Sequence, residues 1–166
     1  LAAIAIPNFL QAQTRSKVAR VTADMRSITM ALETYCADNR YYPPTWVGGA
    51  SGRGGYAYNP LNWDARLVPL TTPVAYIGSV PDDVFQQKLS NGFLFKWFCY
   101  DDKQSRVEAM GTSAWSKLPW MLGFPGPMPY EWQLVSAGPA RIHDWSDIYD
   151  PTNGTMSKGC IFRHGP

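Results

Sequence analysis

Three aspartates near the C-terminus have the residue type and spacing that could hold a cation. Asp144, Asp147 and Asp150 follow one another at intervals of three. Calcium takes about six to eight oxygen ligands from carboxylates, carbonyls and hydroxyls, and such a loop could supply several of them. The spacing differs from the alternation of an EF-hand loop, and aspartates also cap turns, here around Pro151. A calcium site and a set of turns both stay open on the residues alone.

The residue types that carry catalysis do not form a recognisable site. His143 and His164 lie in Gly/Pro-rich terminal segments, with no Gly-x-Ser-x-Gly or His-Glu-x-x-His motif in the chain. Asp82 and Asp83 are adjacent, but neighbouring carboxylates point apart on an extended chain and suit a turn or a helix N-terminus better. Cys99 lies within an apolar run and is expected to be an inert buried thiol. We therefore predict that the protein is not an enzyme.

Length and charge narrow the remaining classes. The 166 residues suffice for one domain with a buried core. The formal net charge is +2, and basic side chains gather only at Arg15, Lys17, Arg20 and Arg26, which share a predicted helix with Asp24. That pattern favours a solvated or lipid-headgroup face, and we expect no nucleic-acid partner. The GGASGRGG stretch lacks the Lys-Ser/Thr of a phosphate loop and predicts a flexible connection.

The three cysteines are Cys36, Cys99 and Cys160, which are far apart and have no zinc-binding spacing. One reading is a single disulfide in an oxidising compartment, with one thiol left over. The other is that all three are small buried hydrophobic residues.

An amphipathic helix should position these groups. Apolar residues recur at alternating steps of three and four, which places them on one stripe of an α-helix. They are Val18, Val21, Met25, Ile28, Leu32 and Tyr35. The other face carries Arg20, Asp24, Ser27 and Glu33 and is expected to meet water. The helix should end near Asp38-Asn39, ahead of two consecutive prolines.

The first ten residues, LAAIAIPNFL, are apolar on every side except at Asn8. Such a segment must be surrounded by lipid or by other helices, yet it is shorter than the ~20 residues that span a bilayer. Pro7 removes one helical hydrogen bond, so we expect a kink or a melted turn there. We predict that residues 1–17 project from a globular head of residues 41–166, on which residues 18–40 pack.

The rest of the chain predicts a small antiparallel sheet with long loops, and hence an α+β fold. The aromatic run at 93–100 and the shorter run at 106–110, separated by DDKQS, predict a β-hairpin, and EWQLVS at 131–136 predicts a third strand. Residues 111–130 are too proline-rich for regular structure. Trp115, Trp120, Met121 and Phe124 in this segment favour packing over the sheet, although an aromatic platform could also bind sugars.

Residues 1–43 resemble a known family. AIAIPNF and ADMRSITMALETYCADNRYYP are similar to the N-terminal helix of type IV pilin-like proteins, closest to the major pseudopilins of type II secretion. Near the C-terminus, Leu134, Ser136 and Gly138 match the Leu-x-Ser-x-Gly pattern that precedes a calcium loop in major pseudopilins. Ala140 and Cys160 depart from the family, whose members often carry acids at these places.

The resemblance implies a pilin-like subunit that polymerises into a helical filament, in the first place a type II secretion pseudopilus. Ile4, Ile6, Pro7, Phe9 and Leu10 would pack against neighbouring helices in the filament core, and the helix would loosen at Pro7. Before assembly the protein would sit in the inner membrane with a periplasmic head, and afterwards in a periplasmic or extracellular filament. Its partners would be other copies and the secretion or pilus assembly machinery.

The resemblance also implies segments and ligands of its own. A leader removed by a prepilin peptidase, a methylated Phe and an apolar stretch with an assembly glutamate would precede Leu1. Calcium would be held by Leu134, Ser136, Asp144 and Asp147.

Two alternatives to the pseudopilus remain at this point. The first is a type IV pilus subunit, which a disulfide between Cys160 and either Cys99 or Cys36 would favour. The second is a membrane-anchored extracellular binding module that uses the aromatic loop.

Overall fold

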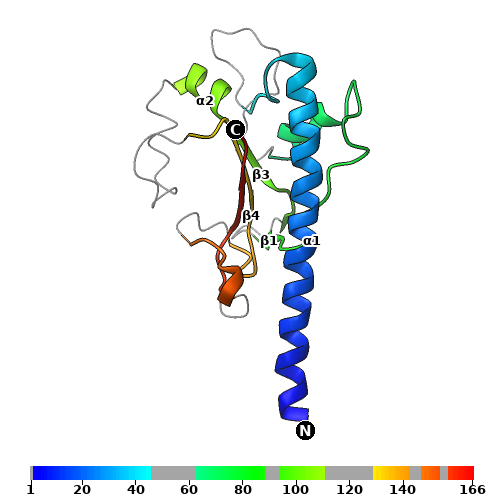
Figure 1. Ribbon diagram of the computed structural model, residues 1–166, viewed down its shortest axis with the longest axis vertical. Coiled ribbons are helices and arrows are strands. Elements are labelled where there is room, and N and C mark those ends of the chain that lie inside the picture. Colours follow the sequence, from blue (N-terminus) through cyan, green and yellow to red (C-terminus); the bar gives the residue numbers. More distant parts are fainter. Residues whose placement is uncertain (1, 46–62, 89–93, 111–128, 143–146, 154–156) are drawn as a thin grey trace.

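The computed structural model describes residues 2–45, 63–88, 94–110, 129–142, 147–153 and 157–166. One helix, α1 (Ala2–Asn39), is the longest element, and at about 1.5 Å per residue its 38 residues extend about 57 Å. The remaining elements lie beside its C-terminal half, and its N-terminal part runs on beyond them (Figure 1).

A three-stranded antiparallel sheet lies against α1. Its strands are β3 (Cys99–Asp102), β4 (Trp132–Ser136) and β5 (Ile161–His164), in the order β3-β4-β5. The central strand fixes the register, with Leu134 opposite Tyr100 on one side and Arg163 on the other. A separate ribbon pairs β1 (Gln87–Lys88) with β2 (Leu94–Phe95). The predicted α+β class is confirmed.

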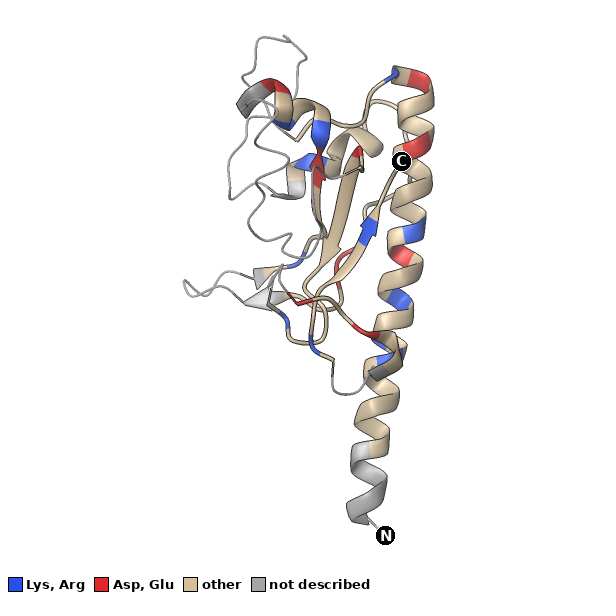
Figure 2. Ribbon diagram, turned by 60° about the vertical axis from the view of Figure 1, so that its left-hand side comes forward, with Lys and Arg blue, Asp and Glu red and all other residues tan. Residues whose placement is uncertain are grey.

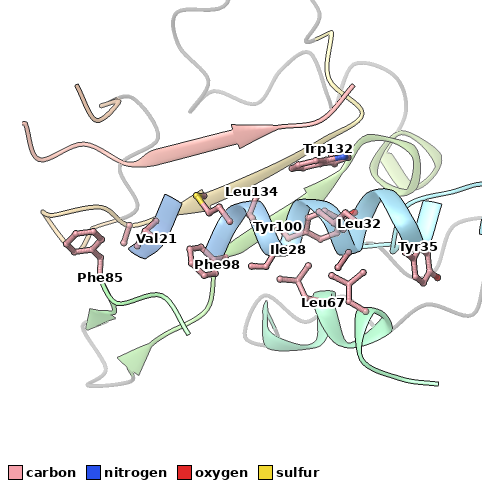
Figure 3. Close-up of a cluster of buried hydrophobic side chains, with 14 residues drawn as sticks. Val21, Ile28, Leu32, Tyr35, Leu67, Phe85, Phe98, Tyr100, Trp132 and Leu134 are labelled. Atoms are coloured by element: carbon pink, nitrogen blue, oxygen red, sulfur yellow. The ribbon is translucent and has the colours of Figure 1, made fainter. Parts of the chain in front are cut away.

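The core is formed where α1 covers one face of this sheet. The predicted apolar stripe is confirmed, because Val21, Met25, Ile28 and Leu32 are at most 1 % exposed. Facing them are the side chains that alternate toward the helix along β3 and β4, together with η1 (Trp63–Leu70), a 3-10 helix (Figure 3). The residues that complete this cluster include Phe98, Tyr100, Trp132, Leu134, Leu67 and Leu70.

The end of α1 lies where the sequence places it, at Asn39. Arg40 follows with φ 64°, and its N–H donates to the carbonyl of Cys36 at 2.7 Å. This left-handed residue closes the helix, and the prolines that come next exclude any continuation.

The predicted hairpin is wrong in its second strand. Residues 106–110 belong to a helix, α2 (Lys103–Met110), which follows β3 directly. The physical reason is Asp102, whose Oδ2 accepts the N–H of Ser105 at 2.7 Å and caps the helix. The segment KQSRVEAM then consists mostly of good helix formers. The third predicted strand, at 131–136, is confirmed by β4.

Two expectations about α1 are also wrong. Helical backbone runs from Ala2 through Pro7 without a break, because a proline in the second turn removes only one hydrogen bond, that to the carbonyl of Ala3. Glu33, expected to meet water, is half-buried: its two carboxylate oxygens accept from Trp132 Nε1 at 3.1 Å and from the Tyr42 hydroxyl at 2.9 Å. This residue therefore ties α1 to the central strand.

Replacing Ile28 with alanine tests which face of α1 is buried. Because Ile28 is 0 % exposed, Ile28→Ala should lower the free energy of unfolding by about 2–5 kcal/mol. Met30, two residues along and 72 % exposed, provides the matched control, and Met30→Ala should change it by no more than about 0.5 kcal/mol. Urea unfolding followed by circular dichroism measures both, and equal losses would contradict the assigned face.

Candidate functional site

The candidate site is the part of α1 that extends beyond the sheet. Phe9 and Leu10 are 61 % and 56 % exposed, although both are large apolar side chains. Ile4 and Ile6 belong to the same stretch, where the structure describes the backbone of α1 but not the side chains. Of the predicted filament-packing set, the described side chains are thus open to solvent rather than folded back onto the head.

Within the described part of the chain, no helix combines the length and the apolarity that crossing a membrane requires. The apolar stretch of α1 gives way to a basic one. Arg15, Lys17, Arg20 and Arg26 are all exposed, and Arg20 lies 3.7 Å from Asp24, one turn further on. Figure 2 shows these basic positions along the helix in blue. An exposed pair of this kind adds little to stability, so the basic residues are available for contacts with other molecules.

The proposed calcium ligands are described in part. Leu134 and Ser136 are fully buried in β4, and the Ser136 hydroxyl accepts the N–H of Gly138 at 3.2 Å. As a residue of the central strand, Leu134 pairs on both sides, which commits its backbone to the sheet. Asp147 is exposed, and Asp144 lies outside the described residues. Among the residues described, no group of three or more His, Cys, Asp or Glu could hold a metal, and the calcium site stays a prediction.

The turn interpretation of the aspartates holds for Asp150. Its Oδ1 accepts both the N–H of Thr152 at 2.8 Å and the Thr152 hydroxyl at 2.7 Å, at the start of η2 (Pro151–Asn153). This Asx turn is what the residues around Pro151 predicted.

The C-terminal loop is held firmly against the end of the sheet. Asp147 O accepts the N–H of Cys160 at 2.8 Å, and the N–H of Tyr149 donates to Cys160 O at 2.8 Å. Two glycines allow this close approach. A Cβ on Gly138, which has φ 65°, would lie 2.0 Å from Gly159 O, and one on Gly159 would lie 2.6 Å from Asp147 O. The exposed side chains of this loop therefore stand on a fixed backbone.

The cysteines are free thiols. Cys99 and Cys160 are buried with Val135 on the face of the sheet that points away from α1, and they flank β4 on opposite sides. Two strand spacings amount to about 9.6 Å, more than the ~7 Å that a disulfide permits between Cα atoms. Cys36, on α1, lies on the other side of the sheet and is half-buried. Burial raises the pKa of the Cys99 thiol well above 9.0, as expected for an inert residue.

A buried ionic cluster on β3 was not recognised from the sequence. Asp101 is 4 % exposed, and its two oxygens contact Arg66 Nη1 at 2.7 Å and Arg106 Nη1 at 3.2 Å. Arg66 also donates to the carbonyl of Tyr100 at 2.7 Å, which fixes η1 to the strand. Desolvation by burial raises the pKa of Asp101, and the two guanidinium groups oppose that rise. The cluster has a structural role, because it joins η1 and α2 to the sheet.

Asp102 forms a second buried network beside the first. Its Oδ1 accepts the N–H of Thr45 at 2.7 Å and the Thr45 hydroxyl at 2.8 Å, while Oδ2 caps α2 through Ser105. The one signal in the sequence is an aspartate three residues before a serine and ahead of helix-forming residues. This carboxylate joins the chain after α1 to the start of α2.

The aromatic platform predicted for residues 111–130 falls almost entirely outside the description. Trp115, Trp120, Met121 and Phe124 all lie in the segment that the structure does not describe. The sugar-binding alternative therefore stays a prediction.

No family model, curated protein or solved structure matches the chain. The functional argument consequently depends on the exposed helix and on the resemblance of its residues.

Removing the Asp102 carboxylate should destabilise the head. Asp102→Ala leaves the N–H groups of Thr45 and Ser105 without their acceptors, and a loss of about 2–4 kcal/mol in the free energy of unfolding is expected. Asp102→Asn keeps a capping oxygen and should lose less. The exposed Asp38 serves as control, since Asp38→Ala should stay within about 0.5 kcal/mol. Urea titrations that show equal losses for Asp102→Ala and Asp38→Ala would contradict this role.

Asp83 gives the protein a pH dependence of defined sign. Its carboxylate is 1 % exposed and accepts the N–H groups of Phe85 at 2.8 Å and Ala137 at 3.1 Å. Desolvation by burial raises its pKa above 3.8, hydrogen bonds from Ser136 and these two amides oppose the rise, and the nearby Asp24 adds to it. The folded state therefore binds this proton more tightly than the unfolded state does.

The contribution of Asp83 to the free energy of unfolding should thus fall as the pH rises from about 3.8 through the raised pKa. Asp83→Asn removes the titration, so the variant should lose less stability than the wild type over this interval. Melting temperatures measured from about pH 3 to pH 7 test the difference. Parallel profiles for the two proteins would show that the group does not act in this way.

Proposed function

We propose that this protein is the structural subunit of a pilus-like filament, built through the N-terminal part of α1. The observation that carries the proposal is the exposure of Phe9 and Leu10, at 61 % and 56 %, on a helix whose other half is firmly packed. Large apolar side chains on a projecting helix find burial most readily among copies of the same helix. The resemblance of residues 1–43 to pilin-like proteins supports the same reading and suggests a pilin-like fold.

The contact between copies is head-to-tail and does not close. Each subunit presents its helix to neighbours that are displaced along an axis, which generates an open helical array. Burial of a large apolar side chain contributes about 1.5–3 kcal/mol before the costs of association are subtracted. Each contact is modest, and the filament is stable because every subunit makes several.

Among filaments, a type II secretion pseudopilus is our first choice. The helix sequence and the Leu134, Ser136 and Gly138 pattern both resemble major pseudopilins. In such a system the subunit sits in the inner membrane with its head in the periplasm and polymerises when secretion is active. Deleting the gene should then abolish secretion of exported proteins.

Electron microscopy of cells that express the full-length gene tests the proposal. Wild-type cells should carry filaments labelled along their length by an antibody to the head. Phe9→Asp should abolish them, because a charge would be buried at every contact. Val74 is likewise exposed, at 54 %, but lies on the head, and Val74→Asp should leave the filaments intact. Membrane-bound monomers in wild-type cells, with no filaments under any condition, would overturn the proposal.

A further inference from the structure

Two surfaces of this chain carry opposite charges that the chain itself does not neutralise. The basic face of α1 consists of Arg15, Lys17 and Arg26, all exposed. The acidic knob consists of Asp147 and Ile148 on the C-terminal loop. Within the described residues, none of these four charged side chains takes part in an ion pair, whereas Arg20, their neighbour on α1, does.

The acidic knob is also apolar and rigid. Ile148 is 52 % exposed, and Ile142, on the same loop, is 56 % exposed. The backbone beneath them is fixed by the bridge between Ile148 and Cys160 and by the close approach of Gly159. Exposed isoleucines beside a carboxylate on a rigid loop have the composition of a protein–protein contact rather than of a solvated surface.

The positions of the two surfaces exclude contact between them within one subunit but allow it between two. η2, which follows the knob and is drawn orange, lies at the end of the head nearer the N-terminus of α1 (Figure 1). A second copy displaced along the helix axis would bring its own α1 past this end of the head. Contact between different surfaces of identical subunits is the kind that propagates.

We propose that the acidic knob of one subunit docks on the basic face of α1 of the next subunit. This inference rests on the proposed function and names the second contact of the filament, in addition to the packing of Phe9 and Leu10. A second copy is the occupant that the charges favour, because it supplies both the basic and the acidic partner. A lipid surface would satisfy Arg15 and Lys17 but would leave Asp147 and the two isoleucines without partners.

A charge swap in the full-length protein tests this docking. Reversing the basic face with Arg15→Glu and Lys17→Glu, or the knob with Asp147→Lys, should each reduce the number of filaments per cell at least about tenfold, because like charges would meet at every contact. Combining all three substitutions restores opposite charges and should recover filaments to within about threefold of the wild type.

Matched controls separate this contact from general effects of charge. Arg40→Glu and Asp38→Lys make the same changes of charge at exposed sites elsewhere on α1 and should leave the filament number unchanged. Melting temperatures of all variants should equal that of the wild type, since the substituted side chains are exposed.

The outcomes distinguish the two levels of the proposal. Normal filaments in the charge-reversal variants, or no recovery in the combined variant, would overturn the docking while leaving the proposed filament intact. If the single variants fail to reach the membrane and the combined variant does not recover, the basic face serves lipid instead, and the docking is wrong. Absence of filaments from wild-type cells would overturn the proposed function itself.

Discussion

The burial of one stripe of α1 against the inner face of the sheet is the interaction on which the rest of the structure depends. Val21, Met25, Ile28 and Leu32 lose nearly all contact with solvent there, and the aromatic and aliphatic side chains of β3 and β4 complete the cluster. No other pair of elements in the described chain brings together so many fully buried residues. The short strands, of four or five residues each, would have little stability without this helix.

Because packing occupies only part of a 38-residue helix, the same element has two environments. Beside the head its polar groups are drawn into the structure: Glu33 binds Trp132 and Tyr42, and Thr29 accepts from Arg163 Nε at 2.7 Å. Beyond the head, Phe9 and Leu10 have no such neighbours. One continuous helix thus links a folded domain to a surface whose burial requires another molecule.

The elements with strong periodicity could be predicted from the sequence, and those that depend on a single side chain could not. The stripe on α1 repeats over five intervals, so its helix, its buried face and its end at Asn39 follow from spacing and from the prolines beyond. Residues 106–110 resembled a strand because their partial alternation was read without the cap at Asp102. One carboxylate in contact with Ser105 decides that segment, and periodicity does not register it.

The polar contacts of the core were harder still to foresee. Asp101 and Arg66 are 35 positions apart, and Trp132 and Glu33 are 99 apart, so nothing local marks them as partners. Of the candidate site, the apolar character of Phe9 and Leu10 and the basic run after them were legible in the sequence. Their exposure depends on where the head ends, which only the packing of α1 determines.

The continuity of α1 through Pro7 has a geometrical consequence. Each residue of an α-helix turns the chain by about 100° and advances it by about 1.5 Å, so the azimuth of Phe9 around the axis is locked to that of the head. Inserting one residue between 11 and 17 would swing the apolar end about a quarter of a turn, whereas inserting seven would nearly restore its phase. The length of this rod, counted in residues, therefore sets the angle at which successive heads would be arranged around a common axis.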